Sequence, residues 1–131
     1  MNAALGNVGK TVVYMAPLSP GSDKLQIDQL RELIGDIDAG RVRMLVILGG
    51  NPVYNAPADL KLTAERMSKI PLRVHHGLYA DESAEQCHWH VADKHYLEGW
   101  GDARAYDGTA SIVQPLIAPL YDGKSIHEVV Q

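Results

Sequence analysis

The sequence predicts a single α/β domain with a three-layer, Rossmann-like fold: a mostly parallel sheet of about four to five strands, followed by an irregular C-terminal strap. Short apolar runs that suit strands alternate along the chain with segments of helical periodicity. Apolar residues make up 46% of the chain, Phe is absent, and Leu, Ile and Val supply the core, as in buried parallel strands. The 131 residues are enough for one domain with a real core.

The first predicted strand covers residues 10–16, KTVVYMA, because these residues are rich in β-branched and aromatic types. A helix is expected next, with Ser22 or Asp23 as its N-terminal cap and Gly40 at its end. Its apolar side chains recur at helical spacing and form one broad stripe. The stripe consists of Leu25, Ile27, Leu30, Leu33, Ile34 and Ile37.

The middle of the chain repeats this alternation of strand and helix. Residues 43–50, RMLVILGG, are predicted to form a strand buried on both faces, because the run is almost continuously apolar. A second helix is expected over residues 58–69 and a third strand over residues 71–77. An acidic helix start follows at residues 81–85, and a fourth strand at residues 87–91. Such alternation is typical of parallel sheets with right-handed crossovers.

The last third of the chain changes character, because it is rich in Gly, Asp and Pro. A short helix is expected over residues 93–100, and residues 100–123 are predicted to form an extended strap with a hairpin that turns at Asp107-Gly108. A short C-terminal helix begins at Ser125. We expect the aromatic side chains of this region to dock on a partner or a neighbouring domain, the alternative being that they cover their own domain. They are Tyr96, Trp100 and Tyr106.

The charge balance and the apolar runs argue against several classes of protein. The net charge is −4 and the basic residues form no cluster, so no nucleic-acid binding is expected. No apolar run reaches the length of a membrane span, so no direct membrane insertion is expected. Gly9-Lys10-Thr11 matches the end of a P-loop, but Ala4 stands where that motif needs glycine, and a strand follows instead of a helix. Nucleoside triphosphate binding is therefore not expected.

The strongest candidate for a binding site is the segment that follows the predicted strand over residues 43–50. There the chain reads Gly49-Gly50-Asn51-Pro52. In an open parallel sheet, ligands bind beyond the carboxyl ends of the strands, where glycines let the backbone approach a ligand closely. The alternative is a turn that simply needs glycine and proline.

Histidines gather around the only cysteine, Cys87. They are His75, His76, His88, His90 and His95. Cys87-x-x-His90 and His88-x-His90 have spacings typical of metal ligands. If the strands are parallel, however, the group of His75 and His76 would lie about 15 Å from the group that begins at His88, at the opposite end of the sheet. We therefore expect no metal site, histidines that bond to loop carbonyls, and a cysteine that only packs; a small histidine-rich metal-binding protein remains an alternative.

These segments together resemble a known family. Residues 44–60, MLVILGGNPVYNAPADL, and the later run that includes CHWHV and WGDARAYDGTASIVQPLIAPLY are similar to part of the molybdopterin oxidoreductase superfamily. The second run is more narrowly similar to the iron–sulfur and molybdopterin-like large subunit of alternative complex III, a bacterial membrane quinol oxidoreductase. The resemblance implies that residues 1–131 are one α/β domain of a larger chain.

The resemblance also implies which residues would bind a cofactor. In the superfamily this region holds one guanosine dinucleotide arm of a bis-pterin cofactor, and seven residues of this chain match the positions concerned. They are Gly49, Gly50, Asn51 and Pro52 in the loop after the strand, Glu82 and Ser83 at the next helix start, and Glu98 after the fourth strand. Cofactor-binding members usually differ, however, from CHWHVA at residues 87–92 and from ARAYDGT at residues 103–109.

These departures lead us to expect no cofactor, no catalytic residue and no metal ligand in this domain, with genuine binding of molybdopterin guanine dinucleotide as the alternative. The resemblance places iron–sulfur clusters elsewhere in the parent chain, because one cysteine cannot ligate a cluster. It implies other domains and subunits as partners, and a parent exported to the periplasmic face of the inner membrane. An isolated domain of this kind exposes apolar surface, so we expect it to self-associate or to be marginally soluble.

Overall fold

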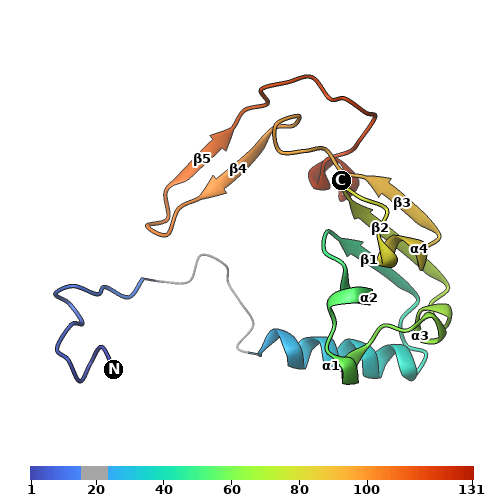
Figure 1. The fold of residues 1–131 in the computed structure, drawn as a ribbon, viewed down its shortest axis with the longest axis horizontal. Coiled ribbons are helices and arrows are strands. Elements are labelled where there is room, and N and C mark those ends of the chain that lie inside the picture. Colours follow the sequence, from blue (N-terminus) through green and yellow to red (C-terminus); the bar gives the residue numbers. More distant parts are fainter. Residues whose placement is uncertain (16–23) are drawn as a thin grey trace.

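The computed structural model describes residues 1–15 and 24–131 (Figure 1). Short helices and strands follow one another along the chain. They are α1 (Gln26–Asp38), β1 (Met44–Leu48), α2 (Pro52–Asn55), the 3-10 helix η1 (Ala58–Leu60), α3 (Ala64–Ser68), β2 (Leu72–Gly77), α4 (Glu82–Glu85), β3 (Trp89–Ala92), β4 (Gly101–Arg104), β5 (Ala110–Val113) and α5 (Ile126–Val129).

The main sheet has three parallel strands in the order β1-β2-β3. Val46 of β1 lies beside Val74 of β2, which in turn lies beside Trp89 of β3. The prediction of an α/β domain with a parallel sheet is therefore confirmed. The described residues give this sheet three strands instead of the four to five expected, because β4 and β5 pair only with each other in an antiparallel hairpin.

Helices cover one face of the sheet. Ile47 points from β1 into a core formed mainly by the apolar stripe of α1 and by residues of η1 and α3. The buried core residues are Ile34, Ile37, Ile47, Leu60, Leu62, Met67 and Ile70. Right-handed crossovers along a sheet with sequential strand order place their helices on the same face, which explains why the helical layer lies on one side.

The opposite face of the sheet, which we call the open face, is apolar and largely uncovered by the described residues. Its exposed side chains are Met44, Val46, Leu48, Leu72 and Trp89. Only His76 on this face is buried, because the C-terminal segment reaches it and its Nε2 donates to the Lys124 carbonyl oxygen at 2.7 Å. The predictions of three layers and of a strand over residues 43–50 buried on both faces are therefore wrong for the structure described.

Two of the predicted helices differ from the structure. The helix expected over residues 58–69 is divided into η1 and α3, because Thr63 caps a new helix by accepting a hydrogen bond from the Arg66 N–H at 3.3 Å. The helix expected over residues 93–100 is a turn instead, in which the Glu98 N–H donates to the His95 carbonyl oxygen at 2.8 Å.

Other predicted boundaries are confirmed. Gly40 follows α1 with a φ of +69°, a left-handed conformation that favours glycine. The acidic segment at residues 81–85 begins α4, which Asp81 caps. The hairpin turns at Asp107-Gly108, and Ser125 begins α5 with a complete capping box. The proposed caps Ser22 and Asp23 lie outside the described residues, and Leu25 stands at the N-cap position of α1.

The N-terminal residues 1–15 form turns and one isolated bridge between Val8 and Val12, and they lie away from the sheet (Figure 1). The strand predicted over residues 10–16 is absent from its described part, residues 10–15, and Ala16 lies outside the described residues. The Gly9 N–H donates to the Val12 carbonyl oxygen at 2.8 Å, so Gly9-Lys10-Thr11 belongs to a turn within this segment.

Within the strap, the β4–β5 hairpin extends away from the sheet (Figure 1). Tyr96, Trp100 and Tyr106 are 68%, 64% and 87% exposed, which contradicts the alternative that they cover their own domain. Within the part of the chain that the structure describes, no helix has the length and apolar character needed to span a membrane.

Candidate functional site

The loop after β1 lies where the sequence places it, at the carboxyl end of the sheet. Gly49 and Gly50 have φ values of +70° and +73°, so both positions favour glycine, and the chain turns sharply out of β1. Asn51 then caps α2, accepting a hydrogen bond from the Tyr54 N–H at 3.3 Å, and Pro52 occupies the first helical position. Local sequence chemistry therefore explains the loop and the short helix α2, although this helix was not among the predicted elements.

Tertiary contacts bring Asn51 together with the two candidate residues of α4. The Asn51 amide nitrogen donates to a Glu82 carboxylate oxygen at 2.6 Å. The Ser83 hydroxyl donates to the Asn51 amide oxygen at 2.8 Å and accepts from the Val53 N–H at 3.0 Å. Ser83 is fully buried. Both ends of the Asn51 side chain are thus engaged in joining the β1 loop to α4.

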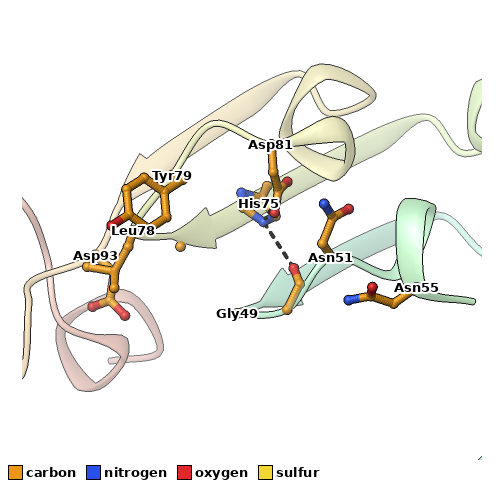
Figure 2. Close-up of a pocket in the computed structure, with 10 residues that line it drawn as sticks. Gly49, Asn51, Asn55, His75, Leu78, Tyr79, Asp81 and Asp93 are labelled. Atoms are coloured by element: carbon orange, nitrogen blue, oxygen red, sulfur yellow. Dashed lines mark hydrogen bonds and ion pairs between the residues drawn. The ribbon is translucent and has the colours of Figure 1, made fainter.

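A cavity of about 430 Å³ opens beside this network at the carboxyl ends of β1 and β2 (Figure 2). Its lining combines loop backbone with amide, carboxylate, imidazole and phenol groups. The lining residues are Gly49, Gly50, Asn51, Asn55, His75, Gly77, Leu78, Tyr79, Asp81 and Asp93. Of the predicted cofactor-binding residues, Gly49, Gly50 and Asn51 line the cavity. Glu82 and Ser83 hold Asn51 by hydrogen bonds from outside the lining, and Pro52 begins α2.

His75 forms the buried wall of this cavity. Its Nδ1 lies 2.9 Å from the Nδ1 of His90, and the two rings are stacked with centroids 5.1 Å apart. One ring must donate its Nδ1–H while the other accepts, so double protonation would place two N–H groups face to face. Burial, and then His75, lower the pKa of His90. The Nε2 of His75 faces the Gly50 carbonyl oxygen at 3.5 Å and an Asp81 carboxylate oxygen at 3.6 Å.

This pair corrects the expected separation of the histidines. Because β3 begins opposite Val74, in the middle of β2, His75 and His90 are neighbours across the sheet and do not lie at opposite ends. The pairing of two strand histidines depends on the register, which no local pattern specifies. The position of the His75 ring also depends on Gly77, since a Cβ at this glycine would lie 2.9 Å from the ring carbon Cε1.

The other residues of the histidine cluster have local structural contacts. His88 accepts a hydrogen bond at Nδ1 from the Arg73 N–H at 3.1 Å. Cys87 packs against the core, and burial raises the pKa of its thiol, which opposes formation of a nucleophilic thiolate. Across residues 1–15 and 24–131, no three His, Cys, Asp or Glu side chains are grouped so that they could hold a metal ion.

Glu98 does not join the other candidate cofactor residues. Its carboxylate accepts hydrogen bonds from the Leu120 N–H at 3.0 Å and the His95 N–H at 3.1 Å, and these bonds lower its pKa. It therefore ties the strap to the turn after β3. The sequence analysis did not identify the cavity residues Asn55, Tyr79 and Asp81. Asn55 is the last residue of α2, and Tyr79 and Asp81 follow β2, so the available signal was their position at the carboxyl edge of the sheet.

Comparisons with known proteins assign no family to this site: no family model matches the chain, and no curated protein sequence matches it significantly.

Proposed function

We propose that this chain is a structural α/β module of a molybdopterin oxidoreductase-like subunit in a membrane-associated quinol oxidoreductase complex. In this proposal the module binds no molybdopterin itself, the iron–sulfur clusters lie elsewhere in the parent chain, and the parent sits at the periplasmic face of the inner membrane. Other domains and subunits cover the open face and complete a Rossmann-like sheet of four to five strands. The activity belongs to the assembled complex, and the isolated module has none.

The open face is the observation that carries this proposal. Parallel sheets occur almost only with both faces covered. Here Val46, Leu48 and Trp89 stay exposed on one face. They are apolar like Ile47, which is buried on the other face. A contiguous apolar surface of this kind typically marks an interaction site. The exposed aromatic residues of the strap support the same conclusion.

The first experiment measures whether the open face associates. Sedimentation velocity of the isolated chain over a range of concentrations should show self-association, because the open face will bury itself against another copy. The variant Val46→Lys/Trp89→Lys should stay monomeric. The matched control Val13→Lys/Tyr54→Lys changes two exposed residues outside both the sheet and the strap, and it should still associate. A wild-type chain that stays monomeric at every concentration would contradict the proposal.

The second candidate function is a retained nucleotide site, favoured by the cavity of about 430 Å³ at the carboxyl ends of the strands. The engaged side chain of Asn51 argues against it, because Glu82 and Ser83 already take its donor and acceptor groups. GDP serves as the probe for the guanosine dinucleotide arm. We expect no change in melting temperature at millimolar GDP; a rise that Asn51→Ala removes would favour the cofactor-binding alternative.

A further inference from the structure

A second cavity, of about 610 Å³, separates the strap from the carboxyl ends of β2 and β3, and we call it the strap groove. It contains no candidate residue of the β1 loop. Its volume falls within the range of about 300–1,000 Å³ that is usual for ligand pockets. The lining residues are Leu78, Tyr79, Ala92, Asp93, His95, Glu98, Ile117, Leu120, Tyr121 and Gly123.

Hydrogen bonds fix the walls of the strap groove. Glu98 holds the Leu120 N–H on one side and the His95 N–H on the other. The N–H groups of Leu116 and Ile117 both donate to the Leu97 carbonyl oxygen, at 2.8 and 3.1 Å. At the far end the strap touches β3 closely, since a Cβ at Gly123 would lie 2.9 Å from the Asp93 carbonyl oxygen. The groove is therefore a built feature and not a gap beside a loose loop.

The charge of the strap groove is one-sided. Among the residues that the structure describes, its lining contains two carboxylates, Asp93 and Glu98, and no lysine or arginine. The cations next to it in sequence face other acids: the Lys94 ammonium lies 2.7 Å from Glu128, and that of Lys124 lies 3.6 Å from Asp122.

Asp93 also retains capacity to bind a ligand. Its carboxylate lies 3.4 Å from the Nε2 of His76, but that nitrogen donates its proton to the Lys124 carbonyl oxygen at 2.7 Å. The Asp93 side chain is 32% exposed, so it remains accessible to an incoming group.

The rim of the groove is apolar and aromatic. Leu78, Ile117 and Leu120 are 49%, 45% and 72% exposed, and Tyr79 and Tyr121 expose most of their rings. An occupant that suits these surroundings has a cationic group for the carboxylates and apolar surface for the rim. Arginine meets both demands, because its guanidinium is weakly hydrated, pairs with carboxylates and stacks on aromatic rings, while its stem packs on apolar surface.

We propose that the strap groove docks an arginine flanked by apolar side chains, supplied by a partner protein, with its guanidinium at Asp93. This inference rests on the proposed function in one respect, namely that the chain works within an assembly. It adds the chemistry of one partner segment and a place where that segment binds.

The test uses short peptides on the isolated chain, followed by nitrogen-15 and proton amide NMR. Acetyl-Leu-Arg-Leu-amide should shift the amide signals of Leu78, Asp93 and Leu120. Acetyl-Leu-Glu-Leu-amide, with the charge reversed, should bind at least about tenfold more weakly, since like charges repel. Asp93→Asn should weaken binding of the arginine peptide about tenfold. The matched control Asp122→Asn removes a neighbouring, fully exposed carboxylate outside the groove and should leave binding unchanged.

Three outcomes would overturn the inference: equal binding of both peptides, no shift at the groove residues, or tighter binding of phenethylammonium than of the arginine peptide. The last would identify a small-molecule pocket. The peptide comparison needs no variant, so misfolding of Asp93→Asn cannot hide the answer. Failure here leaves the open-face association intact, whereas a chain that binds the arginine peptide but never self-associates would contradict the proposed function alone.

Discussion

The two faces of the parallel sheet carry different residues, and the more apolar face is the one left uncovered. The covered face includes Arg73, His75 and His90, whereas the open face consists mainly of Met, Val, Leu and Trp side chains. Along β1, Ile47 is 7% exposed and packs against α1, whereas the adjacent Val46 is 39% exposed on the open face. The strand therefore lacks the alternation of apolar and polar residues that marks a half-solvated sheet. The difference teaches that the apolar composition of a strand indicates which faces need to be buried. The position of the helices determines which of those faces this chain covers itself.

The largest expected effect comes from truncating neighbouring residues of β1 on the two faces. Ile47→Ala should lower the free energy of unfolding by about 2–5 kcal/mol, because it leaves a cavity in the core. Val46→Ala should lower it by less than about 1 kcal/mol, since the side chain is already solvated. Urea denaturation of dilute protein measures both. Equal losses for the two variants would mean that the open face is buried in solution.

A smaller effect is expected at the carboxyl end of the covered face. Gly77→Ala places a methyl group 2.9 Å from the buried His75 ring and should cost about 1–3 kcal/mol by overpacking. The same substitution at Gly99 meets only the Lys94 side chain, at 3.5 Å, and serves as the control with a change within about 0.5 kcal/mol. Thermal unfolding compares the two. If Gly77→Ala were as stable as Gly99→Ala, the His75–His90 contact would not be a rigid part of the core.

The smallest effect concerns α5, in the C-terminal segment that reaches the open face at His76. The Lys94 ammonium, followed by the Ser125 N–H, lowers the pKa of Glu128 from 4.5 to about 2. A carboxylate with a depressed pKa stabilises the fold above pH 4.5, and this contribution is lost as the pH falls towards 2. NMR titration of the Glu128 carboxyl group checks the value. Lys94→Ala should raise the pKa of Glu128 towards 4.5. A pKa near 4.5 in the unmodified protein would show that the Lys94–Glu128 ion pair does not form in solution.

Local chemistry explains which parts of the fold were predictable. The apolar run of β1, the helical stripe of α1 and the turn at Asp107-Gly108 each depend on residues close in sequence, and all three were confirmed. The divided helix at residues 58–69 was missed because Thr63 offers an N-cap within a helical pattern. The strand expected over residues 10–16 was not found in residues 10–15. Residues with high β-propensity form a strand only where they can pair with the edge strand of a sheet.

The candidate site also combines features that were predictable from local sequence with features that were not. The sequence identified Gly49, Gly50 and Asn51 because a glycine-rich turn after a buried strand is a local signal, and the structure places them at the cavity. The family resemblance grouped them with Glu82 and Ser83, which the structure joins to Asn51 by hydrogen bonds. Glu98 was grouped with them too, but it binds the strap instead. Only the packed chain shows which of these side chains remain free.

The sequence alone determined the elements of this protein: apolar strands, an amphipathic helix and glycine turns, all set by interactions between residues near one another along the chain. The tertiary structure alone decided the register that pairs His75 with His90, the face that α1 covers, and the two cavities at the carboxyl edge. These depend on contacts between distant segments, whose relative positions are fixed only when the sheet and its helices pack together.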